Sequence, residues 1–274
     1  MISQQSKFDD FKALHDRAGT FVIPNPWNAG TARILSALGF EVLATTSAGY
    51  AFSVGKRDSS GAISRDEILI NAREIVFATD LPVSADLENG FGENPETCAE
   101  TINMACEIGL VGGSIEDASG DPDNPIYDFN LTVERIIASV GAAQGKPFLL
   151  TARAENFPHG RPDLDDTIKR LQSFENAGAD VLYAPGLPDL DAIRTVCQSV
   201  DKPVNVVMGL SGPRYSVDEL QAAGVKRISV GGSMARAALG AFMRGAEEIL
   251  EKGTFNYADE AVPDFIASSY MSDD

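Results

Sequence analysis

The chain is poor in the side chains on which many catalytic and metal sites depend. It has only three cysteines and two histidines among its 274 residues. Cys98, Cys106 and Cys197 cannot all pair and show no CxxC spacing, which predicts small core residues in a reduced compartment and argues against zinc. With only His15 and His159, most histidine-based triads and histidine-rich metal sites are excluded.

Membrane segments, export signals and positive charge are also lacking. No window approaches the roughly 18 to 20 unbroken apolar residues of a membrane span, and the N-terminus has no hydrophobic signal region. We therefore expect a cytoplasmic protein without a membrane partner. The 22 basic residues against 40 acidic ones give a formal net charge of −18, which repels nucleic acid and anionic lipid. An anionic substrate would need a local positive site.

What the chain does contain is a repeated alternation of apolar, strand-like runs with helical patterns. Eight βα units are what a TIM barrel needs, so this is the fold we predict. The eight expected strands span residues 20–24, 41–46, 82–88, 112–117, 148–153, 180–184, 203–208 and 227–230. Capping boxes at Ser64/Glu67 and Ser216/Glu219 agree with this division. A helix over residues 7–17 is expected to close the bottom of the barrel.

The series predicts a single domain over residues 1–274, because no flexible linker or low-complexity segment interrupts it. The last helix, expected over residues 233–252, is followed by a tail at 255–274. Four aromatic side chains in this tail require burial, and they are Phe255, Tyr257, Phe265 and Tyr270. A partner subunit is one place to bury them, so the tail is interpreted as an oligomerisation segment.

Acidic side chains follow the third and fourth expected strands, at the end of a barrel where TIM-barrel enzymes hold their working residues. Alternation along a strand is expected to point Asp86 and Glu88 to the same side, near an inward-facing Glu116. Asp58, on the loop after the second strand, could reach a metal-bound water or could be a solvated loop acid. Converging carboxylates repel one another without a cation, so Mg²⁺ or Mn²⁺ is expected. The alternative is that the acids pair with arginine.

Arg153 lies where the fifth apolar strand turns polar. A guanidinium there could hold a substrate carboxylate, or a developing enolate oxygen, in bidentate fashion. The alternative is a salt bridge to Glu116 or Glu155, and the two roles are compatible.

Two small, donor-rich loops could bind an anion through backbone N–H groups. One follows the second strand and includes Ser47, Ala48 and Gly49. The other, Gly231 to Ser233, opens the helix after the eighth strand, where many barrels bind phosphate. Position alone does not separate the two.

The motifs, taken in order, resemble those of the isocitrate lyase and phosphoenolpyruvate mutase superfamily over nearly the whole chain. They are the Thr-Ser-Ala-Gly of 46–49, the Gly-Lys-Arg-Asp of 55–58, the Ala-Asp-x-x-x-Gly-Phe-Gly of 85–92, the Ile-Glu-Asp of 115–117 and the Ala-Arg of 152–153. The resemblance implies a TIM barrel that binds Mg²⁺ and a 2-oxo acid. It also implies cleavage or migration of a C–C or P–C bond through an enolpyruvate-like intermediate.

The resemblance also implies roles for individual residues. The implied metal residues are Asp58, Asp86 and Glu116. The implied substrate loop is Ser47, Ala48 and Gly49, which favours the loop after the second strand, and the implied enolate-stabilising arginine is Arg153. Members of the superfamily commonly exchange the last helix between subunits and assemble as dimers of dimers, which would account for the apolar tail.

This chain departs from the family pattern at two places. Ser84 stands where the family has a first acid, and an inserted residue brings in Glu88, so direct metal ligation could pass to Asp86 or Glu88. The segment from Asp117 to Tyr127, which is typical of a mobile lid, contains no cysteine, lysine or histidine. Without the cysteine acid of the family loop, cleavage of isocitrate should be poor, because a positioned acid contributes about 10² to 10⁴-fold.

These observations predict an Mg²⁺-dependent lyase that cleaves the C–C bond beta to the carbonyl of a small, oxaloacetate-like 2-oxo dicarboxylate. Arg153 and Glu116 are the expected catalytic residues, and a homo-oligomer, dimer or tetramer, is expected. One alternative is a phosphoenolpyruvate or phosphonopyruvate mutase or hydrolase acting on a P–C bond. Another is a barrel that binds a keto acid without catalysis. The proton donor stays open among Tyr50, Tyr127, His159 and a metal-bound water.

Overall fold

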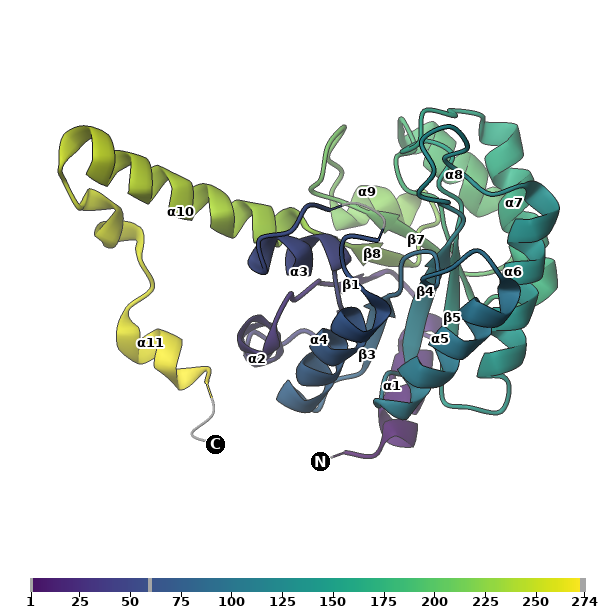
Figure 1. Ribbon diagram of the computed structural model, residues 1–274, viewed down its shortest axis with the longest axis horizontal. Helices are drawn as coiled ribbons and strands as arrows, with labels where there is room; N and C mark the ends of the chain where they lie inside the picture. Colours follow the sequence, from purple (N-terminus) through teal and green to yellow (C-terminus); the bar gives the residue numbers. More distant parts are fainter. Residues whose placement is uncertain (1, 59–60, 272–274) are drawn as a thin grey trace.

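Eight parallel strands form a single sheet that curls into a nearly closed barrel, with helices around it (Figure 1). The structure is a computed structural model and describes residues 2–58 and 61–271. The hydrogen-bonded strand order is β1-β8-β7-β6-β5-β4-β3-β2. The predicted TIM barrel is therefore confirmed. Residues 272–274 of the expected tail lie outside the described residues.

The strands fall within the predicted runs but are shorter than predicted. They are β1 (Phe21–Ile23), β2 (Leu43–Ala44), β3 (Val83–Asp86), β4 (Gly112–Glu116), β5 (Leu149–Arg153), β6 (Val181–Tyr183), β7 (Val204–Val207) and β8 (Arg227–Ser229). The gap between β1 and β2 is bridged by a hydrogen bond of 3.0 Å from the Ala44 N–H to the Pro24 carbonyl. This bond brings the two edges of the sheet together.

Helices follow the strands, and both predicted capping boxes are formed at Ser64/Glu67 and Ser216/Glu219. The helices are α1 (Gln4–Asp16), α2 (Ala29–Ala37), α3 (Ser47–Ser53), α4 (Arg65–Ala78), α5 (Pro95–Glu107), α6 (Phe129–Ala143), α7 (Leu164–Ala177), α8 (Leu190–Gln198), α9 (Val217–Ala222), α10 (Ser233–Lys252) and α11 (Asp264–Ser269), with a 3₁₀ helix at Asn256–Glu260. Within the described part of the chain, no helix has the length and apolar character needed to cross a membrane.

Helix α1 closes the N-terminal end of the barrel, as predicted. Phe11 and Leu14 of α1 form a buried cluster with Phe21, Val42 and Leu149, which come from the amino-terminal ends of strands or just before them. Burying a large apolar side chain contributes about 1.5 to 3 kcal/mol, so this cluster holds the closing helix firmly. The opposite, carboxyl-terminal end of the barrel is left for the site.

Strand β3 ends at Asp86, two residues earlier than predicted. Glu88 has a φ of 47° and Phe91 a φ of 64°, both in the left-handed region that non-glycine residues rarely adopt. The prediction of a strand that continues to residue 88 is therefore wrong, and strand alternation does not set the direction of the Glu88 side chain. A hydrogen bond of 2.9 Å from the Glu116 N–H to the Glu88 carbonyl instead ties this turn to β4.

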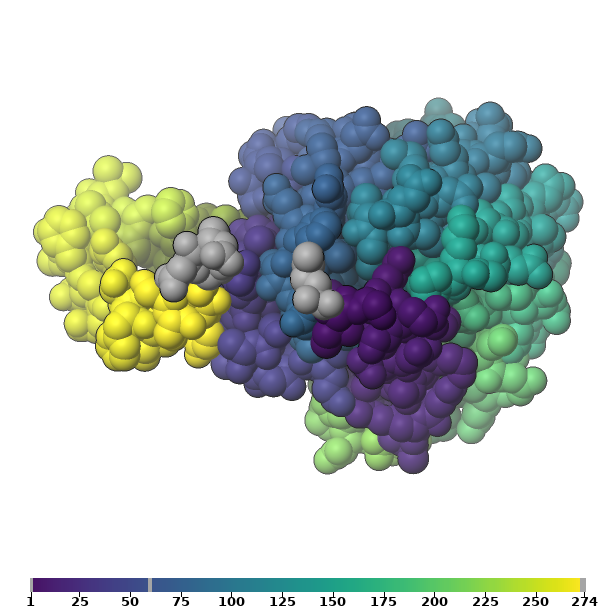
Figure 2. Space-filling view, turned by 90° about the horizontal axis from the view of Figure 1, so that it is seen from below, coloured from purple at the N-terminus to yellow at the C-terminus, as the bar shows by residue number. Residues whose placement is uncertain are grey.

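Helix α10 projects away from the barrel, and the tail after it turns back toward α2 (Figure 1). The space-filling view shows the end of the chain as a separate lobe beside the barrel (Figure 2). Large apolar side chains of this lobe face solvent: Phe242 is 74 % exposed, Leu250 86 % and Phe265 74 %. Of the four aromatic residues predicted to need burial in the tail, Phe255, Tyr257 and Phe265 are exposed and Tyr270 is partly buried.

Candidate active site

A cavity of about 590 Å³ opens at the carboxyl-terminal ends of the strands. It gathers polar side chains from most strands of the barrel. Of the residues predicted to form the site, those lining it are Ser47, Ala48, Asp58, Asp86, Glu88, Glu116 and Arg153. Residues far apart in the sequence therefore meet in one place because parallel strands deliver all their carboxyl ends to one end of the barrel.

Gly49 does not line the cavity, in contrast to the prediction. It is buried in α3, and its N–H donates to the Thr46 hydroxyl that caps the helix, at 3.2 Å. A Cβ on Gly49 would lie 2.7 Å from a methyl carbon of Thr46 and 3.3 Å from Cβ of Ala235. Glycine is required here because a Cβ would collide with the capping Thr46 and press on Trp27 at 3.1 Å as well as on α10.

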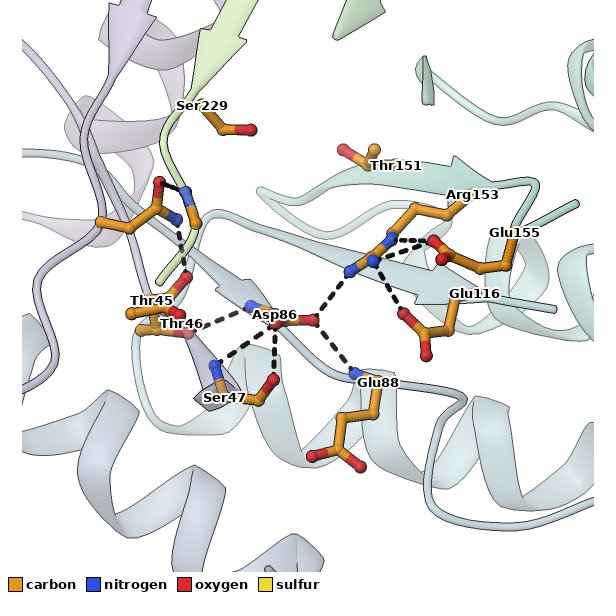
Figure 3. A network of polar contacts seen from close by, with 12 residues as sticks. Thr45, Thr46, Ser47, Asp86, Glu88, Glu116, Thr151, Arg153, Glu155 and Ser229 are labelled. Carbon is orange, nitrogen blue, oxygen red and sulfur yellow. Dashed lines mark hydrogen bonds and ion pairs between the residues drawn. The ribbon is translucent and has the colours of Figure 1, made fainter. Parts of the chain in front are cut away.

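Arg153, at the end of β5, is the centre of the polar network (Figure 3). Its Nη1 lies 3.0 Å from Asp86, and its Nη2 lies 3.0 Å from Glu116 and 2.8 Å from Glu155. The ring of Tyr183 lies below the guanidinium, 4.9 Å from centroid to Cζ. The salt bridges considered as the alternative role of Arg153 are therefore present. Its Nε also donates to Glu155 at 2.8 Å, and its Nη1 donates one hydrogen bond, to Asp86, among the described residues, so a second N–H at Nη1 is available.

Asp86 is held by donors from three directions (Figure 3). One carboxylate oxygen accepts from the Ser47 hydroxyl at 2.8 Å and from the Ser47 N–H at 3.3 Å. The other accepts from Arg153 at 3.0 Å and from the Glu88 N–H at 3.4 Å. The predicted substrate loop after β2 thus positions the predicted metal residue of β3.

Carboxylates outnumber cations in this part of the cavity, and their pKa values reflect it. Burial, together with repulsion by Asp86 and Asp58, raises the pKa of Glu88 to about 8. Burial also raises the pKa of Glu116 well above its ordinary value, although Arg153 works against this. The pKa of Asp58 is raised by partial desolvation from the surrounding protein and by the charge of Asp86, although its side chain still reaches solvent. A bound cation would relieve this crowding of negative charge.

The donor chemistry fits Mg²⁺, which prefers carboxylate oxygens. Among the described residues, however, no three histidine, cysteine, aspartate or glutamate side chains converge closely enough to ligate one ion. Mg²⁺ commonly keeps several waters and uses only one or two protein carboxylates. The arrangement therefore fits a hydrated Mg²⁺ held by one or two of these acids, and not a cage made by all of them.

The two candidate anion loops adjoin each other. A Cβ built on Gly232 would lie 3.2 Å from Cβ of Ala48, and Gly231 and Gly232 both line the cavity. The N–H groups of Val230 and Gly231 donate to the Asn25 side chain, each at 2.9 Å. Two backbone N–H groups of the loop after β8 are therefore already hydrogen-bonded within the protein. The loop after β2 places Ser47 beside Asp86.

The segment from Asp117 to Tyr127 forms a short antiparallel pairing between Ala118 and Ile126. Its base is anchored because the buried Asp117 carboxylate accepts from Arg170 at 3.0 Å and from the Glu155 N–H at 2.7 Å. The segment predicted to be a lid is thus fixed at its base beside the Arg153 network.

Among the side chains considered as proton donors, only His159 lines the cavity. Burial and the charge of Arg153 lower its pKa, so the ring is neutral at pH 7. Further cavity residues were missed from the sequence, among them Tyr183, Asn205 and Arg227. The available signal was a polar residue at alternate positions of otherwise apolar strands, such as Asn205 within Val-Asn-Val-Val.

A TIM barrel with a carboxylate cluster and an arginine at the carboxyl-terminal ends of its strands has the arrangement of an enzyme of this fold. Comparison with known proteins identifies the family. The family model for phosphoenolpyruvate phosphomutase matches residues 11–250. The chain belongs to this family. It is thus an enzyme of the phosphoenolpyruvate mutase/isocitrate lyase superfamily, as the resemblance predicted.

Individual relatives agree with this assignment. A crystal structure from Burkholderia cenocepacia J2315, provisionally named a lyase/mutase, is 58% identical, covers 97% of this chain and 96% of that chain, and gives a TM-score of 0.95. The 2-methylisocitrate lyase of Escherichia coli (strain K12) is 28% identical over 82% of this chain and 78% of that enzyme. The crystal structure of 2,3-dimethylmalate lyase is 25% identical, covers 100% of this chain and 96% of that chain, and gives a TM-score of 0.87.

Proposed function

We propose that this protein is an Mg²⁺-dependent lyase that cleaves the C–C bond beta to the carbonyl of a small, oxaloacetate-like 2-oxo dicarboxylate. The observation that carries the proposal is the meeting of Arg153 with an excess of carboxylates, most of them partly buried, in one cavity. The similarity to lyases named for 2-methylisocitrate and 2,3-dimethylmalate supports a C–C bond and a substrate with more than one carboxylate.

Asp86, Glu88, Glu116 and Asp58 would hold the metal and its waters, as predicted. When bound, Mg²⁺ (or Mn²⁺) supplies positive charge that orients a 2-oxo acid and polarises its carbonyl. Asp86 is the best-placed direct ligand, because the Ser47 hydroxyl and N–H already fix one of its oxygens. The raised pKa of Glu88 supports a place close to the same cation.

Arg153 would stabilise the enolate that is left when the C–C bond breaks. Its remaining N–H at Nη1 can donate to the developing oxygen, while Glu116 and Glu155 keep the guanidinium in position. For Arg153 to bind the substrate through two hydrogen bonds, as expected from the sequence, one of the acids paired with it would have to move away. Ser47 and Ala48 would contact the substrate carboxylate, with Gly49 permitting the close packing behind them.

A second candidate is phosphonopyruvate or phosphoenolpyruvate chemistry, by mutase or hydrolase, which the matching family model favours. Turnover of oxaloacetate and of phosphonopyruvate should be measured with Mg²⁺ and with EDTA, using Asp86→Asn as the inactive control. Turnover of oxaloacetate alone supports the lyase, and turnover of phosphonopyruvate alone supports the second candidate. Binding of either acid by calorimetry without turnover would indicate a keto-acid-binding barrel, and no binding would refute all three.

We also propose that the enzyme is a homo-oligomer, dimer or tetramer, in which α10 and the tail are exchanged between subunits. The support is the exposure of Phe242, Leu250 and Phe265 on a lobe that projects from the barrel (Figure 2). Apolar patches of this kind mark protein interfaces.

A cytoplasmic location is proposed from the cysteine chemistry. Cys98, Cys106 and Cys197 are all free, and the first two are buried. Free, buried thiols without disulfides are typical of a reducing compartment.

A further inference from the structure

The interior of the barrel below the Arg153 network is polar, whereas barrel interiors are usually filled by bulky branched side chains. Ser84, Ser114, Asn205 and Ser229 line the same cavity as the carboxylates. Small hydroxyl side chains leave space that larger apolar residues would occupy. Figure 3 shows Ser229 of β8 set apart from the carboxylate network, with no contact to it marked.

Arg227 of β8 lies in this interior and has no anionic partner. It is 5 % exposed, and no aspartate or glutamate of the described chain lies within ion-pair distance of it. Its Nε donates to Asn205 at 2.8 Å and its Nη2 to the Thr151 hydroxyl at 2.9 Å, both neutral acceptors. Its Nη1 is buried without any partner among the described residues.

A buried, unpaired guanidinium is costly, and proteins normally offset such a charge with an acid. Burial lowers the pKa of Arg227 to about 10, which still leaves it charged at pH 7. The same cavity is lined by five acids, namely Asp58, Asp86, Glu88, Glu116 and Glu155, yet none of them pairs with Arg227. The charge compensation is therefore absent from the part of the chain that the structure describes and would come from a ligand.

The spacing suits one molecule that reaches both levels of the cavity. Arg227 is bonded to Thr151, and Arg153 lies two residues further along the same strand. Two residues of a strand span about 6.6 Å, so Arg153 and the Thr151 side chain that binds Arg227 lie at successive levels of one cavity.

We propose that the chamber lined by Ser84, Ser114, Asn205, Arg227 and Ser229 binds the distal carboxylate of the dicarboxylate substrate. The inference rests on the proposed function, because it assigns the second carboxylate of that substrate class. Arg227 is a specificity-determining residue in this view. It selects 2-oxo dicarboxylates over monocarboxylates, while Arg153 acts at the reacting end.

Calorimetric titration of the full chain with Mg²⁺ tests the assignment, using pyruvate and 2-oxoglutarate as probes with one and two carboxylates. The wild type should bind 2-oxoglutarate about tenfold to 100-fold more tightly than pyruvate, the range expected for a hydrogen-bonded charged pair. Arg227→Gln should remove this preference and leave pyruvate binding unchanged. Exposed Arg194→Gln is the matched control and should keep the preference.

Ser114→Leu provides a second variant, since it fills the chamber and leaves Arg227 in place; it should also abolish the preference. Equal binding of both probes by the wild type, or equal weakening of both by Arg227→Gln in a folded protein, would overturn the assignment. Inorganic phosphate that binds through Arg227 and is not displaced by 2-oxoglutarate would overturn it too. If the preference for 2-oxoglutarate depends on Arg227 but oxaloacetate is not turned over, only the lyase proposal fails. If oxaloacetate is turned over equally well by the wild type and by Arg227→Gln, only the proposed role of the chamber fails.

Discussion

Replacing Glu88 by glutamine should stabilise the metal-free protein at alkaline pH. The Glu88 carboxyl lies near Asp86 and Asp58, and its pKa is raised to about 8 by burial and by these two charges. Glutamine has almost the same shape, keeps the backbone N–H that donates to Asp86, and carries no charge. The substitution therefore removes repulsion without creating a cavity.

The sign and size of the effect follow from the two pKa values. Below about pH 4.5 the carboxyl is protonated in both the folded and the unfolded chain, so the free energy of unfolding should differ little between variant and wild type. Between about pH 4.5 and 8 the Glu88 carboxyl ionises in the unfolded chain but stays protonated in the folded protein, so the wild type loses stability as pH rises. The full pKa difference corresponds to about 5 kcal/mol at most. Glu88 is partly exposed, and solvent screening reduces the expected gain above pH 8 to about 1 to 3 kcal/mol.

Urea unfolding of wild type and Glu88→Gln from pH 4 to pH 9, with EDTA and with Mg²⁺, measures this difference. Saturating Mg²⁺ should reverse the order at alkaline pH, because the cation then stabilises the charged carboxylate. Exposed Glu93→Gln, in the same loop, is the control and should change stability little at any pH. A stability gain for Glu88→Gln that is independent of pH would refute the electrostatic explanation.

The remaining predictions concern the reacting group and the assembly. Arg153→Lys should lower kcat by about 10² to 10³, because an ammonium group cannot replace the donors that the guanidinium presents to the enolate and to the three acids. Steady-state kinetics with oxaloacetate tests this prediction. An unchanged kcat would exclude the role of Arg153 at the enolate. Phe242→Glu should reduce the oligomer to smaller species in light scattering, while Lys252→Glu at the end of the same helix should not. An unaltered mass for Phe242→Glu would show that this face is not the interface.

The part of the site that could be predicted was set by local patterns along single strands. Asp86, Glu116 and Arg153 each end an apolar run, and in a barrel of parallel strands such positions face a common mouth. Neither the partner of each charge nor the conformation of Glu88 follows from those patterns. The left-handed turn at Glu88 depends on its hydrogen bond to β4, a contact between separate strands.

Arg227 illustrates the same limit more strongly. Within its own strand it reads as a polar residue at the start of a short apolar run. Its burial, and the absence of an acid beside it, result from the register that pairs it with Asn205 on β7 and Phe21 on β1. Register between distant segments is a property of the closed barrel, so no local pattern could indicate the chamber.

The amino-acid sequence by itself determined the barrel, the order of its units, the end at which chemistry occurs and the family of the enzyme. These follow from periodicity and from motifs whose members lie close together along the chain. Tertiary structure alone decided that Arg153 joins Asp86, Glu116 and Glu155 in one network, that Gly49 packs behind the site, and that Arg227 stands unpaired inside the barrel. Charge pairing and burial depend on distances in space, and only closure of the sheet sets those distances.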